Sequence, residues 1–211
     1  MTPFIDRFDA GRKLSHKLKR FTNLHPIVVA IPRGGVEIGY EVARTLGFPL
    51  RVFVSRKIGA PHNREFGVGA VAESYTYIDQ ETVQKFDISH DELSLFVQKE
   101  KEEVRRRVKL YRGGKELDIV KRTIIIVDDG LATGVTAIAA VLSLKKLRPA
   151  KIIFASPMMS PHAISQLKAI ADEIIFLVDI PAFGSVSSYY QNFNQVSDKT
   201  VLKLLSSLSP N

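Results

Sequence analysis

The sequence contains no cysteine. This absence excludes disulfide bonds, catalysis by a thiolate and zinc sites built on cysteine ligands. The 5 histidines stand singly along the chain, without the spacing of metal ligands. Neither residue type therefore predicts a transition-metal centre.

A long apolar run is also lacking. No stretch approaches the roughly 18 apolar residues that a bilayer-spanning helix needs. Asp6 and Arg7 bring charge into the N-terminal segment too early for the apolar part of a signal peptide. We therefore expect a soluble, cytoplasmic protein with no membrane partner.

What the sequence does contain is typical of a globular protein. Its 211 residues, 45% hydrophobic and 25% charged, suit a single domain over 1–211. The net charge of +8 suits either an anionic ligand or a solubilising surface. Nucleic acid is not an expected partner, because the basic N-terminal segment accompanies no helix-turn-helix or RNP-type motif.

Apolar runs alternate with segments of helical periodicity along most of the chain. Such alternation predicts a parallel sheet with helices on both faces and a ligand at the carboxyl ends of the strands. The expected strands are 27–31, 50–54, 123–127, 151–155 and 173–178, and the expected helices are 5–21, 36–46, 90–111, 135–147, 162–171 and 197–208.

Residues 56–69 interrupt this alternation. Their glycines and Pro61 forbid a long helix. Arg56 and Lys57 open the segment, which we interpret as a mobile cationic loop. Residues 70–78 predict either one strand or an antiparallel pair. In the long helix that follows, Glu103 and Arg107 are four residues apart and can form an ion pair.

The strongest motif begins at Val127, where a β-branched strand ends on Asp128 and Asp129. The following residues, Gly130, Leu131, Ala132, Thr133, Gly134, Val135 and Thr136, open a helix. A helix N-terminus offers unpaired N–H groups, glycines allow close approach, and threonines add hydroxyls. We interpret this segment as a phosphate site. The paired acids suggest that the ligand also carries hydroxyls and Mg²⁺, which Asp128 and Asp129 could hold directly or through water.

This segment resembles the phosphoribosyl pyrophosphate (PRPP) signature of the type I phosphoribosyltransferases, in particular its adenine-type form. The resemblance extends from about Ile27 to Val196 and is closest to a bacterial branch whose acceptor is unassigned. It implies a doubly wound parallel sheet of about five strands (core about 24–178). A small C-terminal hood (about 179–211, with an N-terminal contribution) would cover the acceptor. It also allows a homodimer.

The resemblance assigns roles outside that segment as well. Arg33, Gly34 and Gly35 would form the loop that binds the diphosphate, and a cis peptide is implied there. Residues 56–69 take the place of a flexible hairpin that closes over the diphosphate, so Arg33 and Lys57 are the expected catalytic residues. In the hood, Phe183 and Tyr189 would face the acceptor base, or simply pack the hood.

Signals for the acceptor conflict. Hypoxanthine-guanine members carry an acid just before the Thr-Gly pair, where this sequence has Ala132. Orotate-, uracil- and adenine-type members share a small residue at that position. Ile180, Pro181 and Phe183 nevertheless resemble the 6-oxopurine hood. We give Ala132 more weight, because this position then has no carboxylate that could act as a general acid or base.

These implications amount to two functional hypotheses. The first is a Mg²⁺-dependent pentosyltransferase that moves ribose 5-phosphate from PRPP to a nitrogenous base or amine, with release of pyrophosphate. The second is a regulatory protein that senses PRPP without catalysis.

Overall fold

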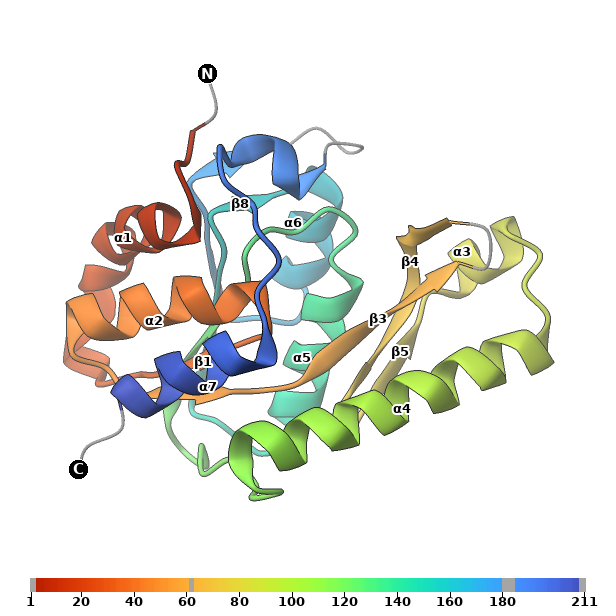
Figure 1. Ribbon diagram of the computed structural model, residues 1–211, viewed down its shortest axis with the longest axis horizontal. Coiled ribbons are helices and arrows are strands. Elements are labelled where there is room, and N and C mark those ends of the chain that lie inside the picture. The colour runs from red at the N-terminus through yellow and green to blue at the C-terminus, as the bar shows by residue number, and fades with distance from the viewer. Residues whose placement is uncertain (1–2, 61–62, 180–184, 209–211) are drawn as a thin grey trace.

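Five parallel strands form the central sheet of the computed structural model, which describes residues 3–60, 63–179 and 185–208 (Figure 1). The strand order is β2-β1-β6-β7-β9. The chain adds β2 on one side of β1 and then adds β6, β7 and β9 in turn on the other side. The winding of the sheet therefore reverses between β1 and β6. The strands are β1 (Ile27–Ala30), β2 (Leu50–Val52), β6 (Thr123–Val127), β7 (Lys151–Ala155) and β9 (Glu173–Ile175).

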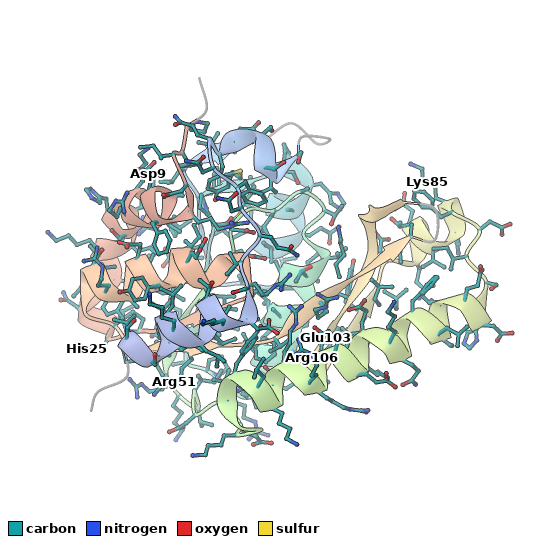
Figure 2. The ribbon with its side chains drawn as sticks, viewed as in Figure 1. Asp9, His25, Arg51, Lys85, Glu103 and Arg106 are labelled. Atoms are coloured by element: carbon teal, nitrogen blue, oxygen red, sulfur yellow. The ribbon has the colours of Figure 1, made fainter. Side chains whose placement is uncertain are left out.

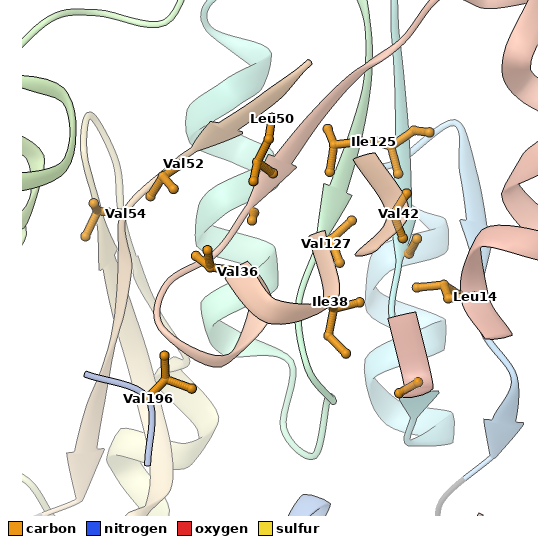
Figure 3. Packing of buried hydrophobic residues seen from close by; sticks show 14 of the residues in the cluster. Leu14, Val36, Ile38, Val42, Leu50, Val52, Val54, Ile125, Val127 and Val196 are labelled. Atoms are coloured by element: carbon orange, nitrogen blue, oxygen red, sulfur yellow. The ribbon is translucent and has the colours of Figure 1, made fainter. Parts of the chain in front are cut away.

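Helices cover both faces of this sheet, which confirms the predicted doubly wound fold (Figure 1). Alternate side chains of each strand point to opposite faces. Val28 and Ile125 therefore pack with α1 (Arg7–Leu18) and α2 (Gly34–Leu46). Figure 3 shows Ile125 in this cluster together with Leu14 of α1 and Val42 of α2. Val29 and Ile126 pack with α5 (Val135–Lys145) and α6 (Pro161–Lys168). The last helix, α7 (Asp198–Ser207), lies against α2.

Several helix ends follow from local sequence. Ser89 and Glu92 form a capping box at the start of the longest helix, α4 (His90–Arg112), and Gly113 ends it with φ 61°. Ser160 and Ser197 cap α6 and α7 through their hydroxyls. The predicted first helix is shorter than expected, because the chain tightens into a 3₁₀ helix, η1 (Lys19–Leu24), after Leu18.

The segment expected to be an irregular loop is instead part of a second, antiparallel sheet. Its strands are β3 (Ser55–Ala60), β4 (Asn63–Ala72) and β5 (Thr76–Ile78). Gly67 and Gly69 misled the prediction, because they are strand residues where a side chain has no room. A Cβ on Gly69 would lie 2.4 Å from the Tyr77 carbonyl oxygen. Residues 70–78 form the antiparallel pair that was one of the two expectations.

This sheet, α3 (Gln80–Lys85) and α4 make up an arm of residues 55–112 that extends from the central sheet (Figure 1). The helix α4 runs along the arm, and its C-terminal part returns to the body. There Arg112 pairs with Glu73, whose other carboxylate oxygen accepts the Val54 N–H at 2.8 Å. The Nε and NH1 atoms of Arg112 are buried and have no partner within the described residues.

We predict that Glu73→Ala lowers the free energy of unfolding by about 3 kcal/mol, because it leaves a buried guanidinium without its carboxylate. Urea denaturation measures the change. Replacing both residues, as in Glu73→Met with Arg112→Met, should recover most of the loss, since no buried charge then remains. A Glu73→Ala variant as stable as wild type would show that this ion pair does not hold the C-terminal end of α4 in place.

Backbone bonds join the start of the chain to its C-terminal region. The Phe4 N–H donates to the Tyr189 carbonyl at 3.2 Å, and the Gln191 N–H donates to the Phe4 carbonyl at 2.9 Å. Short elements complete this end: β8 (Met158–Met159), β10 (Val178–Asp179) and η2 (Val186–Tyr189). Phe183, Ile180 and Pro181 lie outside the described residues.

Candidate functional site

The carboxyl ends of β1 and β6 open into one cavity of about 920 Å³, at the point where the sheet winding reverses. Ala30 and Val127 are register partners on the two strands, and the Ile31 N–H donates to the Val127 carbonyl at 2.9 Å. The loop after β1 and the segment after β6 therefore start side by side. Ligands of doubly wound sheets bind at such a point.

Most residues predicted from the sequence line this cavity. They are Arg33, Gly34, Lys57, Asp128, Asp129, Gly130, Leu131, Ala132, Thr133, Gly134 and Thr136. Gly35 lies behind the surface, where a Cβ would meet the Val127 carbonyl oxygen at 2.8 Å. Tyr189 is not among the lining residues of the described chain.

The loop after β1 reaches the acids directly. The Pro32–Arg33 peptide is cis, as the family resemblance implied. A Cβ on Gly34 would stand 1.9 Å from the Asp129 Oδ2 atom. Only glycine at this position lets the loop backbone and the Asp129 carboxylate share one wall of the cavity.

The two acids differ in their surroundings. Burial, reinforced by the neighbouring charge of Asp129, raises the pKa of Asp128 well above its ordinary value. Its Oδ1 atom accepts the Asp129 N–H at 2.9 Å. The Asp129 Oδ2 atom instead accepts from Arg7 Nε at 2.7 Å. Asp129 thus carries its own counter-charge, whereas Asp128 faces the cavity with less compensation.

Arg7 is a cavity residue that the sequence reasoning missed. It is 6% exposed, and its NH1 atom donates to the Asn194 carbonyl at 2.8 Å. Its guanidinium lies 3.8 Å from the Phe193 ring centroid, a cation–π contact. One side chain from α1 therefore joins Asp129, in the segment after β6, to the C-terminal region. No motif marks it, because the pairing spans 122 residues of sequence.

The segment after β6 is held by backbone and side-chain bonds. The Leu131 N–H donates to the Met158 carbonyl at 3.1 Å, and Ser160 Oγ donates to the Ala132 carbonyl at 2.5 Å. Gly134 has φ 78° and is the N-cap residue of α5. These constraints aim the first turn of α5, with its unpaired N–H groups, at the cavity.

The arm contributes a basic wall. Ser55 Oγ donates to the Thr136 carbonyl at 2.9 Å, which fixes the base of β3 to α5. Arg56 Nε donates to Glu100 at 2.8 Å. The stem of Lys57 passes over Gly67, where a Cβ would lie 3.1 Å from Lys57 Cδ. The hairpin thus places Arg56 and Lys57 in the cavity wall.

The C-terminal region supplies the remaining wall. Val186 packs over Gly130, where a Cβ would lie 2.4 Å from Val186 Cγ1. Ser185, Ser187, Phe193 and Gln195 also line the cavity. This side offers hydroxyls, an amide and one aromatic ring.

The acids fit a cation that is bound together with a ligand. Among the described residues, no group of three or more His, Asp or Glu side chains could enclose a metal. Mg²⁺ commonly uses one or two carboxylates and completes its shell with water and substrate phosphates. Two carboxylates beside a basic wall match that pattern.

Comparisons with known proteins agree with this geometry. The family model described as phosphoribosyl transferase domain matches residues 6–192. The chain belongs to the phosphoribosyl transferase family.

Two curated relatives and one solved structure illustrate the similarity. The chain is 33% identical over 207 residues to two Mycobacterium tuberculosis proteins, "Putative phosphoribosyl transferase MT0597" and "Putative phosphoribosyl transferase Rv0571c". The match covers 97% of this chain and 47% of each relative, so the chain spans about half their length. The crystal structure of TT1426 from Thermus thermophilus is 35% identical with a TM-score of 0.76, over 98% of this chain and 99% of that one. Within the described residues, no helix is long and apolar enough to cross a membrane.

Proposed function

We propose that this phosphoribosyl transferase moves the ribose 5-phosphate group of PRPP, with Mg²⁺, to a small nitrogenous acceptor and releases pyrophosphate. One observation carries the proposal. The reversal point of the sheet brings two neighbouring carboxylates, a helix N-terminus and a basic wall into a single cavity. PRPP has hydroxyls, a monophosphate and a diphosphate, so it presents a chemical group to each of these three features.

The parts of PRPP would be divided along the cavity. The first turn of α5, with Thr133 and Thr136, binds the 5-phosphate through N–H and O–H donors. Asp128 and Asp129 accept hydrogen bonds from the ribose hydroxyls. The loop of Arg33 and Gly34 binds the diphosphate, and Lys57 approaches it from the hairpin.

The chain's residues act mainly by position and charge. The acceptor nitrogen attacks C1 of the ribose as the bond to the diphosphate oxygen breaks, through a state that resembles an oxocarbenium ion. Arg33 and Lys57 stabilise the negative charge that grows on the leaving diphosphate. The hairpin and the C-terminal region keep water away from C1. Mg²⁺, held by Asp128 and Asp129 together with PRPP oxygens, would neutralise part of the diphosphate charge.

The acceptor would bind on the side of Ser185, Ser187 and Gln195, where Phe193 adds an aromatic ring to the wall. Ala132 offers no carboxylate to deprotonate it. An acceptor that is already nucleophilic, or that loses its proton to solvent, suits this wall best.

A screen of nucleobases and small amines tests the proposal. Purified protein is incubated with PRPP, Mg²⁺ and one acceptor at a time, and pyrophosphate release is followed. We expect turnover with at least one acceptor and none without Mg²⁺. Absence of both turnover and PRPP binding would disprove the proposal.

The second candidate, a protein that senses PRPP without catalysis, uses the same cavity. It requires the phosphate site and the acids but has no need of Lys57. Tight PRPP binding without turnover across a broad acceptor panel would favour it. The position of Lys57 in the cavity wall favours the enzyme.

We predict that Lys57→Ala lowers kcat about 10²-fold, with a smaller effect on PRPP affinity. Lys57 would act on charge that develops as the diphosphate leaves, and this is the scale for losing one preorganised group. Single-turnover rates separate chemistry from product release. Lys85→Ala is the matched control, because Lys85 is exposed at the far end of the arm (Figure 2). A chemical rate within about threefold of wild type would remove Lys57 from the mechanism.

A further inference from the structure

The helix α4 presents a charged face to the cavity, although no sequence motif pointed to it. Glu100, Glu103 and Arg107 are spaced three and four residues apart, which places them on one side of a helix. Glu100 pairs with Arg56 at 2.8 Å, and Glu103 pairs with Arg107 at 2.7 Å. Arg56 and Arg107 both line the cavity. Figure 2 shows Glu103 on the part of α4 that returns to the body.

Arg107 is the most buried of the cations that the arm brings to this wall. Its exposed fraction is 5%, and Nε is the atom that donates to Glu103. No described residue accepts a hydrogen bond from its NH1 or NH2 atom. Neither atom is sealed from the cavity, because the buried side-chain nitrogens that lack a partner in the described residues are Nε and NH1 of Arg112. Two guanidinium donors that open into a cavity can bind an anion. Because the residue lines the cavity, a ligand in the cavity can supply that anion.

Arg107 lies on the same side of the cavity as Arg33. Asp198, the first residue of α7, accepts from the Tyr111 hydroxyl at 2.5 Å and lies 4.0 Å from Arg33 NH1. Burial raises the pKa of Tyr111, and the positive charges of Arg107 and Arg33 both oppose that rise. Arg107 and Tyr111 are four residues apart on α4 and so lie on one side of the helix, which brings Arg107 to the side of the cavity where Asp198 links Tyr111 and Arg33.

We propose that Arg107 binds the diphosphate group together with Arg33, and that Glu103 positions it by fixing Nε. This inference rests on the proposed function. A planar guanidinium held at Nε can present its two terminal nitrogens to two phosphate oxygens at once. The diphosphate carries several negative charges, so it can bind a third cation in addition to Arg33 and Lys57. The arm would thereby contribute to PRPP binding through a helix as well as through the hairpin.

The experiment compares two ligands that correspond to different parts of PRPP. Pyrophosphate represents its diphosphate, and ribose 5-phosphate represents the rest of the molecule. Calorimetry measures the binding of pyrophosphate with Mg²⁺, and separately of ribose 5-phosphate, to Arg107→Gln. We expect pyrophosphate affinity to fall between about tenfold and a hundredfold, the scale of a hydrogen bond to a charged group, with ribose 5-phosphate affinity unchanged. Arg107→Lys should give an intermediate loss, because it keeps the charge without the planar fork.

The matched control is Arg105→Gln. Arg105 is an exposed cation on the same helix and does not line the cavity. Its loss removes the same charge from α4, so pyrophosphate affinity should stay near that of wild type.

Each outcome decides the question. Unchanged pyrophosphate affinity in Arg107→Gln, or an equal loss of both ligands, would overturn the inference, since the second result is what a distorted cavity produces. Wild-type protein that binds neither ligand would overturn the proposed function itself. If Arg107→Gln does not fold, Arg107→Lys decides, because selective loss of pyrophosphate supports the inference and an unchanged affinity rejects it.

Discussion

Replacing Asp128 and Asp129 together with asparagine is expected to weaken PRPP binding by about 10³-fold. Each carboxylate would accept from ribose hydroxyls and assist Mg²⁺, and a hydrogen bond to a charged group is worth about 1.5–3 kcal/mol. Two such losses reach this magnitude when converted at about 1.4 kcal/mol per tenfold change. Calorimetry with PRPP and Mg²⁺ measures the affinity.

The structure shows what else the double variant changes. Arg7 loses the charge of its partner Asp129, although Glu37 remains 3.6 Å from its NH1 atom. Thermal unfolding must therefore accompany the binding measurement. A control with the same change of charge is Asp87→Asn plus Asp118→Asn, since both of these acids are exposed outside the cavity. Unchanged PRPP affinity in a folded Asp128→Asn, Asp129→Asn protein would refute the role of the paired acids.

Gly134→Val is expected to abolish ribose 5-phosphate binding, with a loss of at least about 10³-fold. Gly134 has φ 78°, a conformation that valine strongly disfavours. A Cβ there would also lie 3.0 Å from the Ala163 Cβ. The first turn of α5 must then shift, and several N–H donors leave the phosphate together.

A second glycine with positive φ serves as a control for backbone strain, because it lies outside the phosphate site. Gly47 ends α2 with φ 71°, and a Cβ there would meet no atom within 4 Å. Gly47→Val should therefore cost stability without affecting ribose 5-phosphate binding. If a folded Gly134→Val protein bound ribose 5-phosphate normally, α5 would not be the phosphate site.

The sequence alone determined the central sheet and the segment after β6. The strands of the sheet are short apolar runs that are buried on both faces, and the helices that cover it have apolar periodicity and end signals such as Gly47 after α2. These signals are local in the sequence, so they can be recognised without knowledge of the tertiary structure. The segment from Asp128 to Thr136 was found for the same reason, because its acids, glycines and threonines are contiguous.

The arm was predicted less well, because its glycines have two physical meanings. A sequence cannot distinguish a glycine that breaks a strand from one that makes room for a neighbour. Gly67 is of the second kind, since a Cβ there would lie 2.7 Å from Val135 Cγ2 of α5. The hairpin expected from family resemblance was therefore present where residue patterns indicated a loop.

Only the tertiary structure decided which distant cations reach the cavity. Arg7 comes from the first helix, where it stands between Asp6 and Phe8 without a motif. Arg107 comes from the arm, where it follows two other arginines that look the same in the sequence. Arg105 and Arg106 differ from Arg107 only in the direction in which α4 points them. That direction depends on how the helix packs against the body, through the Asp198–Tyr111 bond, and against the rest of the arm, through the Glu73–Arg112 pair. The sequence indicated the Glu103–Arg107 pair by its spacing, but only the fold brings Asp129 to Arg7 and turns Arg107 into the cavity.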